Sequence, residues 1–248
     1  MSVNGFRSLL AVAVVLNLGL SGCSSMKAKP SEGAGFVPVQ EMSKREDLPF
    51  NKVWVKAGVD WKRYQSIYIR EVSSDYLMQS DWWKKGMRKN DMEKDARKVA
   101  QYMHDRFAEA FREDPRNRFA VVTSPEPGSL TLALALTELV PSHPVMEALS
   151  IAAPYGSGVA VQAAAKESGA KATVAFEARI EDSVTGEVLA MAADREQGKM
   201  APVNLRALTW YGEAYVIIDE WAGQFVQIAN RRPGEVVKDS SPFTLMPW

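Results

Sequence analysis

The chain has 248 residues, of which 46% are hydrophobic and 24% are charged, a composition typical of an ordinary globular protein. Thirty Lys and Arg residues balance thirty Asp and Glu residues, so no strong net field favours nucleic acid as a partner. A single Cys excludes an internal disulfide and a zinc site built from several Cys, and two His leave little material for metal chemistry.

Residues 1–22 have the layout of a signal peptide. One cation, Arg7, precedes an apolar run from Leu9 to Leu16, and small residues follow. The run is shorter than the roughly 20 residues that a membrane-spanning helix needs. It leads into Leu20-Ser21-Gly22-Cys23, which resembles the lipobox of bacterial lipoproteins.

The lipobox resemblance implies a lipid attachment site at Cys23. In such proteins a diacylglyceryl group is added to the sulfur, the signal peptide is removed just before the Cys, and the new amine is acylated, commonly with palmitate. Ser24 after the Cys implies delivery to the outer membrane, with the body on its periplasmic face. The alternative is a chance Cys near an ordinary cleavage site.

The mature chain divides into three parts. Residues 23–47 are rich in Ser, Lys, Pro, Gly and Glu, which predicts a lipidated flexible tether with a reach of about 25–30 Å. Residues 48–232 form the expected periplasmic α/β domain. Residues 233–248 form a C-terminal tail, and its apolar end, Pro242 to Trp248, is expected to fold back on the body or to dock into a partner.

The first elements of the domain are a strand, a helix and a short strand. Ser66 to Val72 has the β-branched and aromatic content of a strand. Apolar residues at spacings of three and four predict a helix that starts at Asp91 as N-cap and ends before Pro115. Phe119 to Val122 reads as a short strand.

The second half of the domain begins with period-two patterns. Leu130, Leu132, Leu134 and Leu136 alternate with small residues, which predicts a strand whose leucine face is core. Residues 171–182 continue the alternation, with Glu177 and Glu181 expected on a wet face. A turn at Asp182 to Gly186 predicts a hairpin, and residues 204–229 read as a second long helix. We therefore expect an α+β fold: a two-layer helix-on-sheet domain with a mostly antiparallel mixed sheet and two long helices.

This order of elements resembles the domain-of-unknown-function 3313 family of Gram-negative envelope lipoproteins. The residues that carry the resemblance are Phe176-Glu177-Ala178, the run from Thr185 to Ala190, and Trp221-Ala222. It covers about residues 50 to 230 and implies a small periplasmic α/β domain without implying an activity.

The candidate chemical motifs are weak. His104 and His143 have no second ligand at metal spacing, and Gly156-Ser157-Gly158 lacks the spacing of a nucleophile elbow. The acidic pairs Asp91/Asp95, Glu177/Glu181 and Asp219/Glu220 are better explained by helix capping and solvated surface than by paired-carboxylate catalysis. We expect no enzyme activity and no catalytic, cofactor-binding or metal residues.

Two further segments leave alternatives open. Trp82-Trp83-Lys84-Lys85 suits a lipid headgroup interface, but a loop with one Trp in the core and solvated Lys residues explains it better. The Ala- and Gly-rich stretch from Val145 to Ala165 suits a partner surface or a helix and loop that cover the core.

The leading expectation is a non-enzymatic, membrane-tethered interaction module of the cell envelope. Its expected partners are the membrane, through the acyl anchor, and envelope proteins, with no nucleic acid and with self-association left open. The alternative is a periplasmic binding module for a small apolar ligand or lipid, which needs a ligand-sized cavity beneath the leucine face.

Overall fold

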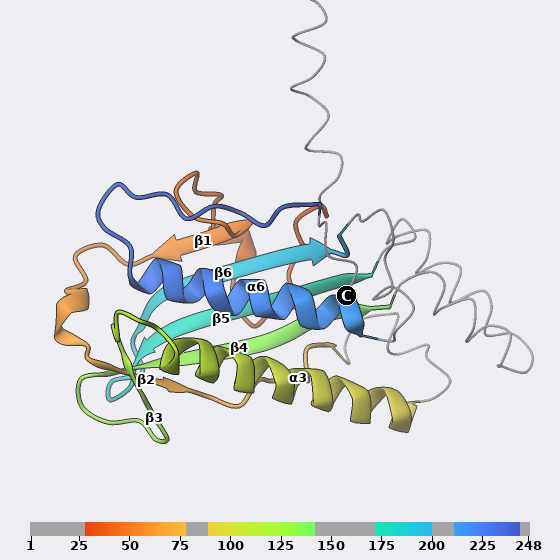
Figure 1. Ribbon diagram of the computed structural model, residues 1–248, viewed down its shortest axis with the longest axis horizontal. Helices are drawn as coiled ribbons and strands as arrows, with labels where there is room; N and C mark the ends of the chain where they lie inside the picture. Colours follow the sequence, from red (N-terminus) through yellow and green to blue (C-terminus); the bar gives the residue numbers. More distant parts are fainter. Residues whose placement is uncertain (1–27, 78–88, 142–171, 200–210, 244–248) are drawn as a thin grey trace, which may run out of the picture.

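The computed structural model describes residues 28–77, 89–141, 172–199 and 211–243 (Figure 1). Within these ranges the elements follow in chain order: η2 (Val39–Glu41), β1 (Lys52–Val55), η3 (Trp61–Arg63), β2 (Ser66–Ile69), α3 (Lys89–Arg112), β3 (Ala120–Val122), β4 (Ser129–Val140), β5 (Thr173–Asp182), β6 (Val188–Gln197) and α6 (Gly212–Ala229).

The strands form one six-stranded sheet in the order β1-β6-β5-β4-β2-β3. The pairings β1/β6, β6/β5 and β5/β4 are antiparallel, whereas β4/β2 and β2/β3 are parallel. This mixed sheet with two long helices confirms the expected α+β class. β1 was not predicted, because its four residues are too few to show a clear period.

The leucine-rich strand is confirmed as the centre of the core. Leu132, Leu134 and Leu136 on β4 are completely or almost completely buried. Leu134 lies opposite Ala178, and Leu136 lies opposite Phe176 on β5, so the apolar faces of both strands coincide. The register shifts after Leu136, which lets Leu139 return to the same buried face.

The hairpin between β5 and β6 forms as predicted. The side chain of Asp182 accepts hydrogen bonds from the backbone N–H groups of Val184 and Thr185, and Gly186 has a φ of +71°. The hydrogen bond from the Thr185 backbone is the main reason why the pKa of Asp182 lies below its usual value. Hydrogen bonds and a positive φ within the turn therefore determine how β5 connects to β6 at this end of the sheet.

Helices α3 and α6 lie side by side across one face of the sheet (Figure 1). Phe107 of α3 and Phe225 of α6 contact each other, and Phe225 also contacts Phe176 of the sheet.

α3 starts at Lys89, so Asp91 lies inside the helix and not at its N-cap. Tyr211 occupies the N-cap position of α6, and residues 204–210 of the expected second helix lie outside the described residues.

The opposite face of the sheet is covered by an N-terminal segment, residues 28–43, which we call the strap. Val37, Val39 and Met42 of the strap are buried against Ala193 of β6, with Trp54 and Met191 at the edge of the cluster. Ser43 closes the strap with backbone hydrogen bonds to Val53 of β1. The packed body therefore starts before residue 48, because these apolar strap residues bury enough surface to order a segment whose composition suggests a flexible chain.

The C-terminal residues also lie on the body. Val237 is buried, and its N–H donates to the carbonyl oxygen of Asp47. Phe243 is 50% exposed, and residues 244–248 lie outside the described part of the chain.

Candidate functional site

The site with the most unusual chemistry lies on the sheet face covered by the strap, which we call the strap face. Side chains alternate along β5, so Phe176 and Ala178 face the helices, whereas Glu177 and Arg179 face the strap. The strap face carries several charged side chains on a sheet that is otherwise made of small and apolar residues.

Glu177 fastens the strap to the centre of this face. Its side chain is almost completely buried, at 1% exposure. One carboxylate oxygen accepts a hydrogen bond from the backbone N–H of Ala34, and the other accepts from the N–H of Val37 at 2.7 Å. Hydrogen bonds to an ionised acceptor are the stronger kind, and both oxygens are used here.

The expectation that Glu177 and Glu181 lie on a wet face is wrong, since both are buried. The period-two pattern correctly placed them opposite the apolar face. It could not show that a segment more than 130 residues away in the sequence covers that side of the sheet.

Two glycines shape the strap where it meets Glu177. Gly33 and Gly35 have φ values of +97° and +93°, a region that residues with a Cβ rarely adopt. The two glycines flank Ala34, and their positive φ values turn the chain so that the N–H groups of Ala34 and Val37 both reach the Glu177 carboxylate. A Cβ at Gly33 would overlap Val39 of the strap itself, whereas a Cβ at Gly35 would meet open space.

Beside Glu177, aromatic and cationic groups share the strap face. The guanidinium of Arg179 lies 4.4 Å from the ring centre of Phe36, and the Phe36 and Tyr76 rings meet edge to face at 5.3 Å. Arg179 and Arg70 both lie within 3.2 Å of Glu181 carboxylate oxygens. The strap is thus held by a ring contact as well as by the Glu177 hydrogen bonds.

A third contact holds the N-terminal end of the strap, at Lys29. Arg195 of β6 donates two hydrogen bonds of 2.8 Å to the carboxylate of Glu138 on β4. Another nitrogen of the same guanidinium donates to the carbonyl oxygen of Lys29 at 3.3 Å. Arg195 therefore joins the start of the strap to the end of the sheet formed by Val140, Thr173 and Gln197.

A buried acid lies on the helix side of the sheet. Asp194 of β6 is 2% exposed and accepts hydrogen bonds from the indole of Trp221 and from the backbone N–H of Asn51. Burial raises the pKa of Asp194 to about 6. The sequence analysis did not single out Asp194, although its spacing of two from Ala192 on β6 places it on the same inward face.

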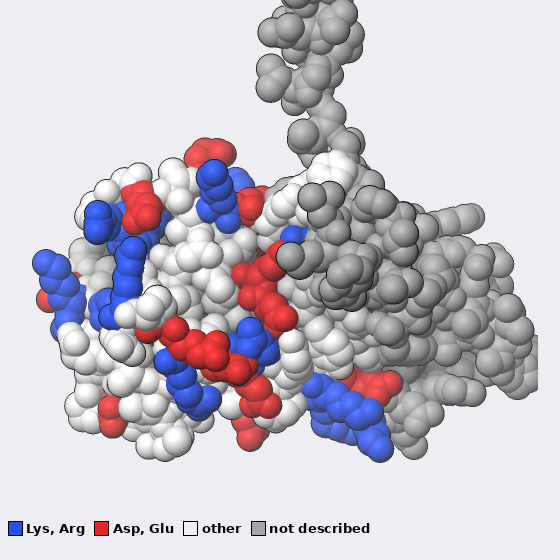
Figure 2. Space-filling view, in the orientation of Figure 1, with Lys and Arg blue, Asp and Glu red and all other residues white. Residues whose placement is uncertain are grey.

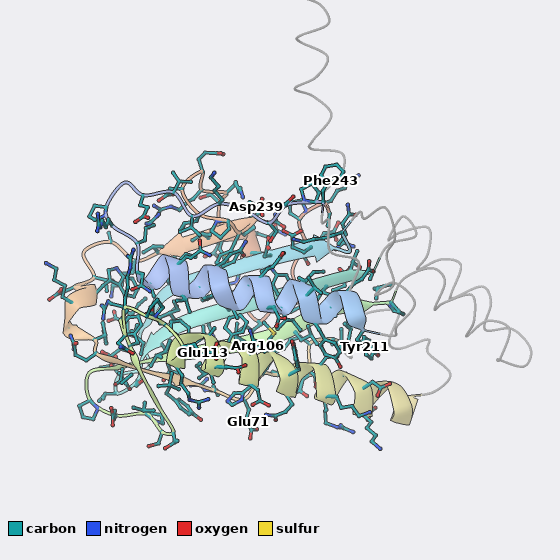
Figure 3. The ribbon with its side chains drawn as sticks, viewed as in Figure 1. Glu71, Arg106, Glu113, Tyr211, Asp239 and Phe243 are labelled. Carbon is teal, nitrogen blue, oxygen red and sulfur yellow. The ribbon has the colours of Figure 1, made fainter. Side chains whose placement is uncertain are left out.

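Three of the remaining acidic candidates, Asp95, Asp219 and Glu220, form ion pairs in or beside the helix layer. Asp219 of α6 accepts hydrogen bonds from Tyr102 and Arg106 of α3, at 2.7 and 2.8 Å. Figure 2 shows both signs of charge interspersed on this side of the molecule, and Figure 3 labels Arg106 between the two helices. Asp95 pairs with Lys98 and Glu220 with Lys199, so these acids stabilise surfaces and helix contacts.

The other predicted residues do not assemble into a reactive centre within the described part of the chain. His104 contacts the neighbouring Asp105 on α3. Several residues and segments that the sequence singled out lie outside the described ranges: Cys23, Trp82-Trp83-Lys84-Lys85, His143, Val145 to Ala165 and Gly156-Ser157-Gly158.

In the ranges that the structure describes, no group of three or more His, Cys, Asp or Glu is placed to hold a metal ion. No helix in those ranges is both long and apolar enough to cross a bilayer.

These features define an α+β domain whose second sheet face is covered by its own N-terminal strap. The chain matches the family model described as "Protein of unknown function (DUF3313)" over residues 34–225, and it belongs to that family. This confirms the resemblance seen in the sequence, and the match begins at Ala34, where the strap first contacts Glu177.

Comparison with curated proteins finds no match. Among solved structures, the chain is similar to two PelC dodecamers from Paraburkholderia phytofirmans, one of them a point variant. Each is 10% identical, with TM-scores of 0.37 for the variant and 0.39 for the other. The matches cover 69% of this chain and 96% and 95% of those chains.

Proposed function

We propose that this protein is a lipoprotein of the bacterial cell envelope, anchored through acylated Cys23 to the periplasmic face of the outer membrane. Its body acts as a non-enzymatic interaction module, a two-layer helix-on-sheet domain. Several acyl chains at about 0.8 kcal/mol per buried CH₂ retain a water-soluble body on a bilayer. Confinement at the membrane raises the effective concentration of the body near its partners, so weak contacts suffice.

One structural observation carries this proposal. The segment that follows the lipobox is not a loose end, because Glu177 and Arg195 bind its backbone on the sheet. Such fastening couples the position of an N-terminal anchor to the body. Together with the signal-peptide layout and Leu20-Ser21-Gly22-Cys23, it supports an anchor at this end of the chain.

Packing beneath the leucine face supports an interaction module over a lipid carrier. Leu130, Leu132, Leu134 and Leu136 are between 0 and 2% exposed and belong to one core cluster with Phe176 and Trp221. A carrier needs a ligand-sized space where these side chains meet the helices. Mass spectrometry of the purified mature protein tests this point, since a stoichiometric co-purified lipid would favour the carrier.

The anchor is tested by metabolic labelling with palmitate in the native host. We expect label in the wild-type protein and none in Cys23→Ser, with the wild type in the outer-membrane fraction. Equal labelling of both proteins, or no labelling of either, contradicts the anchor. Crosslinking of the wild type in cells then identifies the envelope partners and shows whether a second copy of the chain is one of them.

A further inference from the structure

The strap packs on a part of the sheet that is separate from the main core. Buried apolar side chains form two clusters, and the smaller one joins three strap residues to Ala193 of β6. The main cluster includes Leu48 and Phe50, which follow the strap in the sequence. Because the two clusters are distinct, the strap can lift from the sheet as a local unit without opening the main core.

The sheet residues beneath the middle of the strap are small, apart from one carboxylate. Ala135 of β4 and Ala193 of β6 are the register partners of Glu177 on its two sides, and Ala175 precedes Glu177 on the same face of β5. All four side chains are buried, and we call these four residues the strap seat. Their small neighbours let the main chain of the strap approach the Glu177 carboxylate within hydrogen-bond distance.

Charged side chains surround the strap seat. Arg179 follows Glu177 on the strap face of β5, and the ion pair between Arg195 and Glu138 flanks Ala175. The side chains of Arg179, Arg195 and Glu138 are partly exposed even with the strap in place. Without the strap, this face would carry the polar side chains typical of the solvated side of an antiparallel sheet.

The carboxylate of Glu177 suits a cover that can be removed. Replacing a permanently buried ion by a well-packed apolar side chain is often neutral or stabilising, so stability alone does not favour a carboxylate here. Its two hydrogen bonds come from main-chain N–H groups, which any extended peptide offers. When the strap lifts, water solvates the carboxylate and no charge is left buried.

We propose that the strap seat is a peptide-binding surface, that the strap occupies it in cis, and that a partner protein binds there by displacing the strap. The partner contributes a segment with the chemistry of the strap: a glycine-containing turn that presents two main-chain N–H groups, followed by aliphatic side chains at the positions of Val37 and Val39. A segment in cis has a high effective concentration, so the strap excludes weak competitors. This inference rests on the proposed interaction module, to which it gives a binding site, and is independent of the acylation of Cys23.

The test measures the binding of a strap peptide to the full mature chain. The probe is a fluorescein-labelled peptide with the sequence of residues 31–43, and its binding is followed by fluorescence anisotropy. The parent protein carries Cys23→Ser so that it stays free of lipid. A second protein, the weakened-strap variant, adds Val37→Ser and Val39→Ser, which remove apolar contacts of the strap and leave the strap seat unchanged.

We expect the dissociation constant of the peptide to be at least tenfold lower for the weakened-strap variant than for the parent, because the altered strap competes less well. Adding Glu177→Ala to this variant should weaken peptide binding at least tenfold, whereas adding Glu113→Gln at the end of α3 (Figure 3) should leave it unchanged. A peptide methylated at the main-chain nitrogens of Ala34 and Val37 lacks both donors and should not bind.

Three results would overturn the proposal. The first is that the unmodified peptide does not bind the weakened-strap variant, or that the methylated peptide binds it equally well. The second is that this variant forms dimers in sedimentation velocity, which would assign the strap seat to a second copy of the chain. The third is a large loss of thermal stability in this variant, which would show that the strap belongs to the main core.

The outcomes also separate the strap seat from the proposed function. If crosslinking in cells captures envelope partners but the peptide does not bind, the strap seat is wrong and the interaction module stands. If the peptide binds as expected but crosslinking captures no partner, the strap seat stands as a peptide site and the interaction module is wrong.

Discussion

The indole Nε1 of Trp221 donates a 2.9 Å hydrogen bond to an Asp194 carboxylate oxygen inside the core. Both side chains are buried, and the Trp221 ring also meets Phe176 edge to face at 4.6 Å. An ionisable group in such surroundings is costly when charged, even with two hydrogen-bond donors. This pair therefore makes the stability of the body depend on pH.

We predict that the free energy of unfolding decreases as the pH rises from about 4 to about 7. The pKa of Asp194 in the folded protein, about 6, lies above its ordinary value of 3.8, so the folded state binds the proton more tightly than the unfolded chain does. The stabilising contribution is complete below about pH 4 and is lost as the pH rises through 6. A shift of this size corresponds to about 3 kcal/mol.

The measurement is urea unfolding of the wild type and of Asp194→Asn across this pH range. Asn does not titrate, so the difference in stability between the two proteins should change by about 3 kcal/mol between pH 4 and pH 7. A difference that stays constant with pH would show that Asp194 does not titrate in this range.

Trp221→Phe should destabilise the body by about 2–3 kcal/mol at pH 7, because it removes the hydrogen-bond donor to Asp194 and leaves a small cavity. The indole hydrogen bond lowers the pKa of Asp194, so its loss should also move the pH-dependent step upward. Trp61→Phe is the matched control, since Trp61 is only partly buried at the edge of the core. Equal losses in both variants would argue against a special role for the hydrogen bond.

Gly33→Ala should loosen the strap more than Gly35→Ala. Both glycines have positive φ, so the backbone strain is similar, but only at Gly33 does the added Cβ overlap Val39. Limited proteolysis of the strap checks this, and cleavage between residues 28 and 43 should be faster in Gly33→Ala. Equal cleavage of the two variants would show that backbone strain alone decides the effect.

Glu177→Gln should speed amide hydrogen exchange at Ala34 and Val37 by about tenfold or more, corresponding to the loss of about 1–2 kcal/mol of hydrogen bonding. In the amide side chain an NH₂ donor replaces one of the two carboxylate oxygens, so one of the two strap N–H groups loses its acceptor. Glu113→Gln, an exposed change at the end of α3, is the control and should leave both amides protected. Unchanged exchange in Glu177→Gln contradicts the role of this carboxylate.

Tyr102→Phe should reduce stability by about 1 kcal/mol, because it removes the hydrogen bond that joins α3 to Asp219 of α6. Burial first, and then Asp219, raise the pKa of Tyr102 above its ordinary value, so its phenol stays a donor at neutral pH. A double-mutant cycle of Tyr102→Phe with Asp219→Ala measures the coupling. A coupling energy near zero would mean that the hydrogen bond adds nothing to the helix contact.

Local patterns in the sequence determined most of the secondary structure. The alternation from Leu130 to Leu136 and the helical stripe through Met103 and Phe107 predict β4 and α3, because side-chain periods of 2 and 3.6 depend only on neighbouring residues. The Asp182 to Gly186 turn is equally local. The lipid attachment site at Cys23 was inferred differently, from the resemblance of Leu20-Ser21-Gly22-Cys23 to a lipobox, and it stays a sequence-based prediction.

Only the tertiary structure decided which surfaces are covered. The alternation along β5 placed Glu177 on the face opposite the core. The strap that buries it comes from residues 28–43. The composition of the strap, rich in Gly, Pro and Glu, gave no sign that its few apolar residues pack against the sheet. The burial of Asp194 also depends on a distant residue, since Trp221, which covers it, lies 27 positions away in the sequence. Burial is a property of contacts between distant segments, and a single sequence specifies those contacts only through the fold as a whole.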